Sequence, residues 1–320
     1  MELPPLVCEG WKIEVLGPDV LRFIKEDGEK IEFSFYFPEY VKVGRLTELI
    51  LILERSLTKG YFSCCVGNTF FELSRAGDQW ILEARGRVEL QLSCSTREAL
   101  CLALALFYVR EEEPSGHELY EMFNYPGLLS LFRKVGKIHV EDVPVSYTLV
   151  WEGSQPYLLP ERAVAGTELA TIMSLSEALG RKTIKISEEE ALELIFSIEG
   201  LSEVLEDNEA LMEARKYLAR ILASTVQHSS TLEFGKDEIH VKNEYGTWEI
   251  DLEDGDLFLN DNHICVELVS SMNIISLPEV GTLKVDENTA KVLSSLMVAL
   301  RPDEVEDPSI RRQIRRALED

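Results

Sequence analysis

The sequence lacks the short motifs that identify common active sites. It contains no Walker A loop, no G-x-G-x-x-G segment, no G-x-S-x-G elbow and no H-E-x-x-H pair. No two of its five histidines lie four residues apart, a spacing that places two metal ligands on one face of a helix. We therefore predict no catalytic residue, no cofactor and no metal ligand, and we favour a protein that is not an enzyme.

Cysteine occurs without a redox or metal-binding pattern. The sequence has no C-x-x-C pair and no histidine at metal-ligand spacing from its six cysteines, which are Cys8, Cys64, Cys65, Cys94, Cys101 and Cys265. Two of them, Cys101 and Cys265, lie within apolar runs. We expect those two to be small buried hydrophobic side chains.

Long hydrophobic runs and a secretory signal are also missing. The longest strongly apolar run, residues 99–109, is too short to span a bilayer and is typical of a buried helix. Met1 is followed by Glu-Leu-Pro-Pro, without a basic region leading into an apolar one. We expect a cytoplasmic protein that does not cross a membrane.

Positive charge is scarce. The chain has 32 Lys and Arg residues against 57 Asp and Glu residues, which gives a net charge of −25 at pH 7. Such a surface repels phosphate backbones, so it disfavours nucleic-acid binding and favours a basic protein partner or simply good solvation. The acidic segment 251–256 fails the EF-hand calcium template and is more simply a hairpin turn at Asp254-Gly255.

Residues 71–110 hold the clearest structural pattern. Three alternating apolar and polar runs are separated by Gly77 and Gly86, and an apolar helical run follows. Ser95 and Glu98 form a capping-box pattern at the start of that run. The stretch predicts an antiparallel β-meander with a helix that covers its apolar face.

The flanking segments are less regular. Residues 12–35 predict a hairpin with a turn at Asp27-Gly28, and residues 44–58 predict a helix, with a buried strand through 49–53 as the alternative. Residues 137–151 predict one or two strands. A second capping box at Ser187 and Glu190 opens a helical stretch that runs to about residue 225.

Part of the first meander is echoed near the C-terminus. With one deletion, residues 77–86 align with residues 246–255, so that both flanking glycines and the tryptophans Trp80 and Trp248 coincide. The segment 90–93 and the helix after it resemble 283–286 and the helix from Thr289. A tandem duplication is our preferred interpretation, although two unrelated meanders with glycine turns would also look alike.

The predicted fold class is therefore α+β, with two antiparallel meander-plus-helix modules joined by a mainly helical middle segment. The predicted domains are an N-terminal module at 1–113, an irregular and helical region at 114–228, and a C-terminal module at 229–320. The two tryptophans should occupy equivalent places in the two modules.

The last helical pattern is the one concentrated basic element of this acidic chain. Apolar residues four apart lie on one face, and two arginine pairs flank them. A helix docked on its own acidic body explains the pattern most simply, with docking on a partner as the functional alternative. The candidate partner-binding residues are Ile310, Arg311, Arg312, Ile314, Arg315 and Arg316.

Three functions follow from these observations. The leading hypothesis is a non-catalytic interaction or scaffold protein, a subunit or adaptor of an intracellular assembly with a protein partner. The first alternative is a nucleic-acid-binding protein that stacks bases on Trp80 and Trp248, although core packing is the more usual role of a strand tryptophan. The second alternative is a metal-dependent hydrolase that uses some of the many acidic residues.

Overall fold

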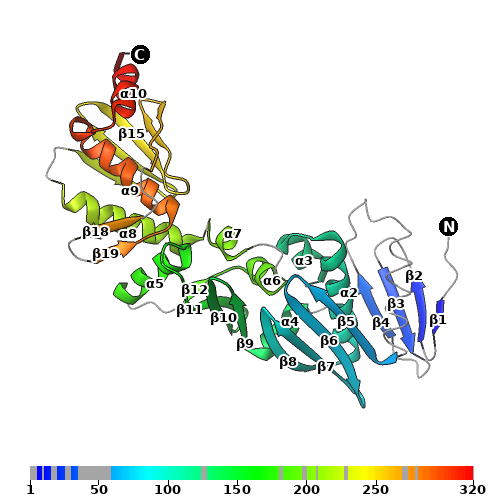
Figure 1. Ribbon diagram of the computed structural model, residues 1–320. Helices are drawn as coiled ribbons and strands as arrows, with labels where there is room; N and C mark the ends of the chain where they lie inside the picture. Colours follow the sequence, from blue (N-terminus) through cyan, green and yellow to red (C-terminus); the bar gives the residue numbers. More distant parts are fainter. Residues whose placement is uncertain are drawn as a thin grey trace. The chain divides into compact units, whose positions relative to one another are not determined.

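The computed structural model describes residues 6–8, 11–15, 20–25, 30–34, 59–123, 128–179, 183–196, 200–206, 208–226, 230–268, 273–277 and 280–319. The predicted 44–58 segment and the turn at Asp27-Gly28 lie outside these residues. The chain forms two compact units, unit 1 with residues 1–159 and 185–200 and unit 2 with residues 160–184 and 201–320. Both combine antiparallel sheets with helices, which confirms the α+β class (Figure 1).

The described residues of unit 1 form two antiparallel sheets. The smaller one has the order β1-β2-β3-β4, with β1 at Leu6–Cys8, β2 at Trp11–Val15, β3 at Val20–Lys25 and β4 at Lys30–Ser34. The larger one has the order β12-β11-β10-β9-β8-β7-β6-β5, so every strand pairs with its neighbour in sequence. Its strands are β5 Tyr61–Val66, β6 Thr69–Ala76, β7 Gln79–Gly86, β8 Val88–Cys94, β9 Lys137–Asp142, β10 Val145–Glu152, β11 Gln155–Arg162 and β12 Ile184–Lys185.

The described residues of unit 1 include four helices: α2 Thr96–Glu112, α3 Gly116–Phe123, α4 Leu128–Val135 and α6 Glu188–Phe196. Helix α2 packs against β5, β7 and β8, and α4 packs against β8 and β9. Every side chain of α2 from residue 99 to 109 is buried, as expected for a helix that is apolar on all sides. The sequence therefore predicted correctly that this run is a buried helix.

Both predicted capping boxes are present. The amide N–H of Glu98 donates to Ser95 Oγ at 3.3 Å, and the amide N–H of Ser95 donates to Glu98 Oε2 at 2.8 Å. At α6, the amide N–H of Glu190 donates to Ser187 Oγ at 3.0 Å, and the amide N–H of Ser187 donates to the Glu190 carboxylate. These bonds satisfy backbone donors that the first helical turn leaves without a partner.

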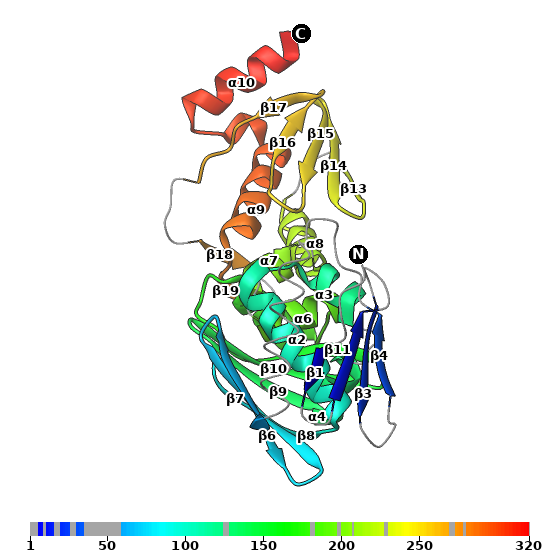
Figure 2. The ribbon, with the colours of Figure 1, turned by 90° about the vertical axis from the view of Figure 1, so that its right-hand side faces the viewer.

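Unit 2 is built on a five-stranded antiparallel meander, β13-β14-β15-β16-β17, and a separate hairpin, β18-β19 (Figure 2). Helix α9 packs on β14 and β15, and α8 packs on α9 and α5. The bounds are α5 Glu168–Leu179, α7 Leu201–Glu206, α8 Glu209–Ser224, β13 Thr231–Phe234, β14 Glu238–Asn243, β15 Gly246–Asp251, β16 Leu257–Leu259, β17 Asn262–Ile264, β18 Ile274–Leu277, β19 Gly281–Lys284, α9 Glu287–Leu300, η1 Pro302–Glu304 and α10 Pro308–Glu319.

The two units divide the chain differently from the three predicted segments. Residues 114–228 are shared between the units, because β9, β10 and most of β11 extend the sheet of unit 1 while α5, α7 and α8 belong to unit 2. The pairing of β8 with β9 brings Val88 opposite Val140. This long-range pairing carries the first meander well beyond residue 113.

The predicted equivalence of the tryptophans can be compared directly. Trp80 lies on β7 and Trp248 on β15, each the third strand of its meander, and both side chains are buried. The correspondence ends farther along the chain. Strand β8 pairs with β7 in the main sheet of unit 1. In contrast, β19, which contains Leu283, forms a two-stranded sheet with β18 among the described residues. The tandem duplication stays a prediction.

None of the helices that the structure describes combines the length and the apolar character needed to cross a bilayer.

Candidate functional site

The most highly organised polar cluster of unit 2 surrounds Arg215. This residue lies on α8 between Leu211 and Leu218, two fully buried residues on the apolar face of the helix. That position directs the arginine into the core, where none of it is exposed to solvent. A charged side chain in such a place must find its partners inside the protein.

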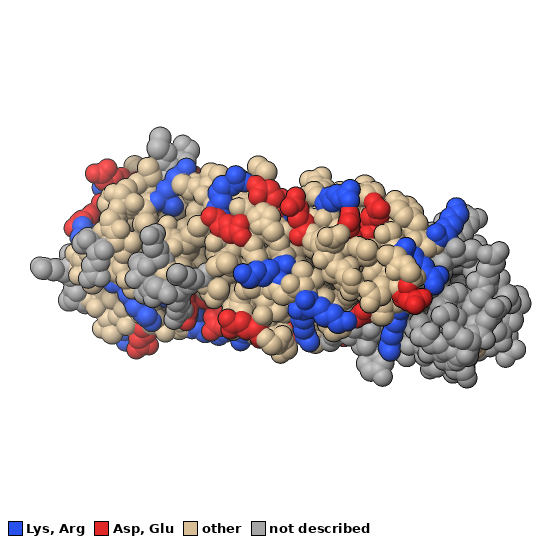
Figure 3. Space-filling model, turned by 90° about the horizontal axis from the view of Figure 1, so that it is seen from below, with Lys and Arg blue, Asp and Glu red and all other residues tan. Residues whose placement is uncertain are grey.

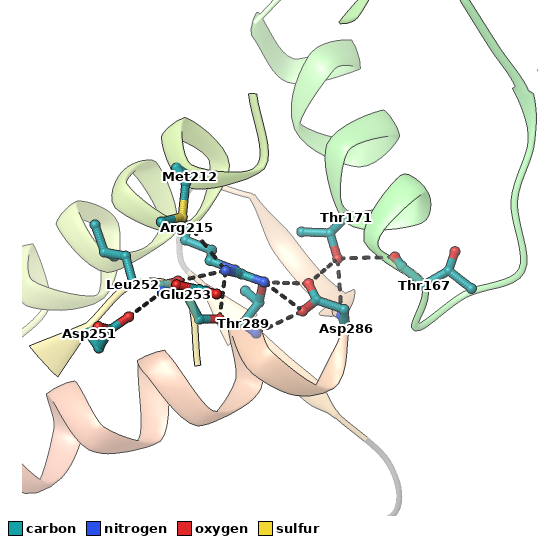
Figure 4. Close-up of polar contacts among 9 residues, drawn as sticks. All are labelled: Thr167, Thr171, Met212, Arg215, Asp251, Leu252, Glu253, Asp286 and Thr289. Carbon is teal, nitrogen blue, oxygen red and sulfur yellow. Dashed lines mark hydrogen bonds and ion pairs between the residues drawn. The ribbon is translucent and has the colours of Figure 1, made fainter. Parts of the chain in front are cut away.

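The guanidinium group uses all three of its nitrogen atoms (Figure 4). Nη1 donates to the carbonyl oxygens of Leu252 at 2.6 Å and Glu253 at 2.8 Å, in the turn after β15. Nε donates to Thr289 Oγ1 at 3.2 Å, and Nη2 lies 3.5 Å from Asp286 Oδ1. The group therefore joins α8 to that turn and to the start of α9.

Asp286 connects the cluster to a third helix. It is the N-cap of α9, where Oδ1 accepts from the amide N–H of Thr289 at 2.8 Å. Its Oδ2 accepts from Thr171 Oγ1 of α5 at 3.1 Å, and Thr171 Oγ1 accepts from the amide N–H of Asp286 at 3.1 Å. One buried carboxylate therefore joins α5, α8 and α9, as Figure 4 shows.

The electrostatics of the cluster favour a structural role. The Arg215 and Asp286 side chains are each only 1% exposed, so each compensates for the lost hydration of the other. Nearby, burial raises the pKa of Glu168 above its usual range, and the negative charge of Asp286 raises it further. Because each guanidinium nitrogen already has a protein partner, the cluster holds the helices together and offers little to a ligand.

Unit 1 contains a comparable arginine. Arg87, between β7 and β8, is 7% exposed and donates through Nη1 to the carbonyl oxygen of Leu194 on α6 at 2.6 Å. Its Nη2 lies 3.2 Å from both Asp142 Oδ2 and Tyr147 Oη. Burial raises the pKa of the Tyr147 hydroxyl well above its usual value, so the tyrosine remains neutral beside the arginine.

The predicted C-terminal helix is present as α10, and its apolar face is packed on unit 2. Ile310 and Ile314 are 7% and 5% exposed and, together with Ala317, join the core of this unit. Gln313 Oε1 also accepts from the amide N–H of Cys265 at 2.8 Å, next to strand β17. In this structure the two predicted partner-binding isoleucines are therefore covered by their own unit, as the simplest interpretation of the sequence expected.

The arginines of α10 have a different environment. All four are exposed, and we call them together the arginine face: Arg311, Arg312, Arg315 and Arg316. Nε of Arg311 donates to the carbonyl oxygen of Val305, and Nε of Arg312 donates to that of Pro308 at 3.2 Å. Within the described part of the chain, none of the four forms an ion pair with a carboxylate. Their terminal nitrogens are open to another molecule.

The two candidate stacking residues are not at the surface. Trp80 is 3% exposed and Trp248 is fully buried, with its Nε1 donating to Asn243 Oδ1 at 3.0 Å. Neither indole offers an open ring face on which a base could stack. Both tryptophans are packed in the core, which is the role that the sequence favoured for them.

The acidic segment 251–256 forms a turn. The amide N–H of Gly255 donates to the carbonyl oxygen of Asp251 at 3.1 Å, and the side chain of Asp251 accepts from the amide N–H of Glu253 at 2.7 Å. Across the residues that the structure describes, no three His, Cys, Asp or Glu side chains are grouped so that they could hold a metal ion. Cys64, Cys65, Cys94, Cys101 and Cys265 are free thiols. Cys101 is buried, as the sequence predicted. The predicted burial of Cys265 is wrong, because this residue follows the end of β17 and is exposed.

Sequence reasoning did not identify the Arg215 cluster. One signal was available, because an arginine at a position where the helical pattern requires an apolar residue must be paired in the core. The sequence also marks Asp286 as a possible helix N-cap, because aspartate is a preferred cap residue and Asp286 precedes the predicted helix from Thr289 by three residues. Nothing in the sequence indicated that these two residues, one on α8 and one at the start of α9, would meet.

Comparisons with models of protein families, with curated proteins and with solved structures find no match for this chain.

Proposed function

We propose that this protein is a non-catalytic interaction protein, a subunit or adaptor of an intracellular assembly, which contacts its partner through the arginine face of α10. The observation that carries the proposal is the division of α10 into two faces. The buried face anchors the helix on unit 2, and the opposite face presents four guanidinium groups without carboxylate partners among the described residues.

Arginine is well suited to such a contact. Its planar group donates several hydrogen bonds in a fixed geometry and is more weakly hydrated than the ammonium group of lysine. Arginine is also enriched at protein interfaces, where carboxylate pairing provides specificity. A helix held by its own apolar face presents these groups from a stable backbone, which reduces the ordering cost of binding.

The overall negative charge favoured a basic partner, but the visible surface gives that idea less support. On the face shown in Figure 3, Lys and Arg side chains are interspersed with Asp and Glu, and neither sign forms a continuous patch. The concentrated basic element, α10, favours an acidic partner instead. The nucleic-acid alternative required Trp80 and Trp248 to be accessible for stacking, and both are buried.

The test compares the size of the native complex in cells that carry different versions of the chain. The wild-type protein should elute from gel filtration of a cell extract well above its own mass of 36.3 kDa. The variant Arg315→Gln/Arg316→Gln should shift toward the mass of the isolated chain, because it removes two arginines that make no hydrogen bond within the described structure.

The matched control removes the same charge elsewhere in unit 2. Lys236 and Lys242 are exposed residues, so Lys236→Gln/Lys242→Gln should leave the complex intact. Elution of the wild-type chain at its own mass would contradict the proposal, as would an equal shift in both variants. Detection of a turnover activity that one point mutation abolishes would also contradict it.

A further inference from the structure

We infer that the arginine face binds a short acidic segment of another protein, about two helical turns long, and that it does not bind a nucleic acid. This inference rests on the proposed function and specifies the partner. Two features of α10 support it: the spacing of the arginines and the charges at the two ends of the helix.

The arginines form two short rows. Arg311 and Arg315 are four residues apart, as are Arg312 and Arg316, so each pair lies one turn apart on the same side of the helix, with a rise of about 6 Å. Carboxylates repeated at three or four residues on a partner helix have the same spacing. Each arginine can then pair with one carboxylate, in the bidentate geometry that suits both groups.

Acidic residues limit the length of this basic surface. Four exposed acids precede α10, namely Asp303, Glu304, Glu306 and Asp307, and Glu319 lies at its C-terminal end. Arg301 pairs with Glu304 at 3.0 Å, so Asp303, Glu306 and Asp307 supply most of the negative charge before the helix. The helix has 12 residues and is therefore about 18 Å long. A ligand that extends past either end of α10 approaches negative charge.

This arrangement discriminates against long polyanions. Duplex DNA carries about one charge per 1.7 Å of its axis, so phosphates would continue beyond the arginine face in both directions. Screening acts over about 8 Å at physiological salt and does not remove repulsion at contact distance. The surface of an anionic membrane also carries negative charge beyond both ends of α10, where the acidic residues repel it. A short acidic peptide segment can end where the arginine face ends and so avoids this repulsion. Repulsion at the ends therefore adds specificity to the attraction at the centre.

The experiment measures binding of the full chain to defined probes by fluorescence anisotropy. The main probe is a labelled helical peptide of about 10 residues, shorter than α10, with four glutamates in two rows at the i, i+4 spacing. The comparison probes are a single-stranded oligonucleotide and a duplex, each longer than α10, and a vesicle that contains anionic lipid. All probes are measured at about 0.15 M salt, where weak long-range attraction is screened.

The peptide should bind the wild-type chain more tightly than the oligonucleotides or the vesicle do. Replacing two arginines in Arg315→Gln/Arg316→Gln should weaken peptide binding by about fivefold or more. The control Lys236→Gln/Lys242→Gln should change it by less than about twofold.

Three results would overturn the inference. Tighter binding of an oligonucleotide or vesicle that is lost in the arginine variant would show that the partner class is wrong while the arginine face still functions as an interaction surface. Peptide binding that is equally weakened in both variants would show that only the total charge matters. Arginine-dependent self-association in sedimentation, without peptide binding, would assign the face to a second copy of this chain. Failure of the proposed function is detected separately, by an unchanged complex in the cell extract.

Discussion

The two units bury an arginine in different ways. Arg215 of unit 2 is fully enclosed, and its partner Asp286 has a side chain only 1% exposed. Arg87 of unit 1 is nearly as buried, but the side chain of its partner Asp142 is 31% exposed. Water can therefore hydrate Asp142 when the arginine is removed, whereas it cannot reach Asp286. We therefore expect the cost of losing each buried arginine to depend on how well its remaining carboxylate partner is solvated.

The largest effect is expected for Arg215→Met. The substitution leaves Asp286 as an unpaired buried charge and removes the arginine donor from the carbonyl oxygens of Leu252 and Glu253, so unit 2 should lose about 3–5 kcal/mol of stability. Hydrogen exchange of α8 and α9 in increasing urea would measure the loss. The control is Arg220→Met on the exposed face of the same helix, which removes the contact of Arg220 with the Phe234 ring. A cost for Arg215→Met no greater than that of the control would contradict the role assigned to the cluster.

A smaller effect is expected for Arg87→Met in unit 1. The carbonyl oxygen of Leu194 and the hydroxyl of Tyr147 lose a donor, but Asp142 can be hydrated, so the cost should be about 2 kcal/mol. Hydrogen exchange of β8 and α6 is the measurement, and Arg85→Met, two residues away and exposed, is the control. If Arg87→Met costs as much as Arg215→Met, the solvation of the carboxylate does not explain the difference between the units.

The helix caps extend the same comparison. Ser95 caps α2 at an exposed position, whereas Asp286 caps α9 inside the core. Ser95→Ala should therefore cost only about 1 kcal/mol, the usual value for the loss of an exposed cap. Urea denaturation would measure it against Ser93→Ala, an exposed serine in β8. A cost above about 3 kcal/mol would mean that this cap carries tertiary contacts as well.

The smallest expected effect is a gain in stability, on replacing Glu168, where the preceding substitutions cause a loss. Because the pKa of Glu168 is raised in the folded protein, its ionised form lowers stability at neutral pH, and this cost disappears as the pH falls through the folded-state pKa. Glu168→Gln should therefore stabilise unit 2 at pH 7, and the gain should vanish in acid. Thermal denaturation across pH, with exposed Glu249→Gln as the control, would show this. A gain that persists unchanged at low pH would contradict the electrostatic explanation.

Much of the local structure could be predicted from the sequence. The capping boxes at Ser95 and Ser187, the buried helix α2 and the apolar face of α10 all follow from patterns within a few residues of one another. These interactions are local, so their geometry depends little on the rest of the chain. The burial of Trp80 and Trp248 follows from strand alternation in the same way.

The division into units could not be predicted because it depends on contacts between distant residues. Strand β9 could have paired with another strand or formed a separate hairpin, and its alternation pattern would be the same in each case. The site presents the same difficulty: the pattern of α10 fits both docking on its own unit and docking on a partner. Only the packing of Ile310 and Ile314 against unit 2 shows which face remains open.

The sequence by itself determined the α+β class, the caps, the central apolar helix and the two-faced character of the last helix, because each rests on side-chain periodicity or on hydrogen bonds between near neighbours. The tertiary structure alone decided that Arg215 meets Asp286, that residues 114–228 are shared between two units, and that the arginines of α10 face solvent. The physical reason is that burial and charge pairing depend on the tertiary environment of a side chain. That environment forms only when segments far apart in the chain pack together.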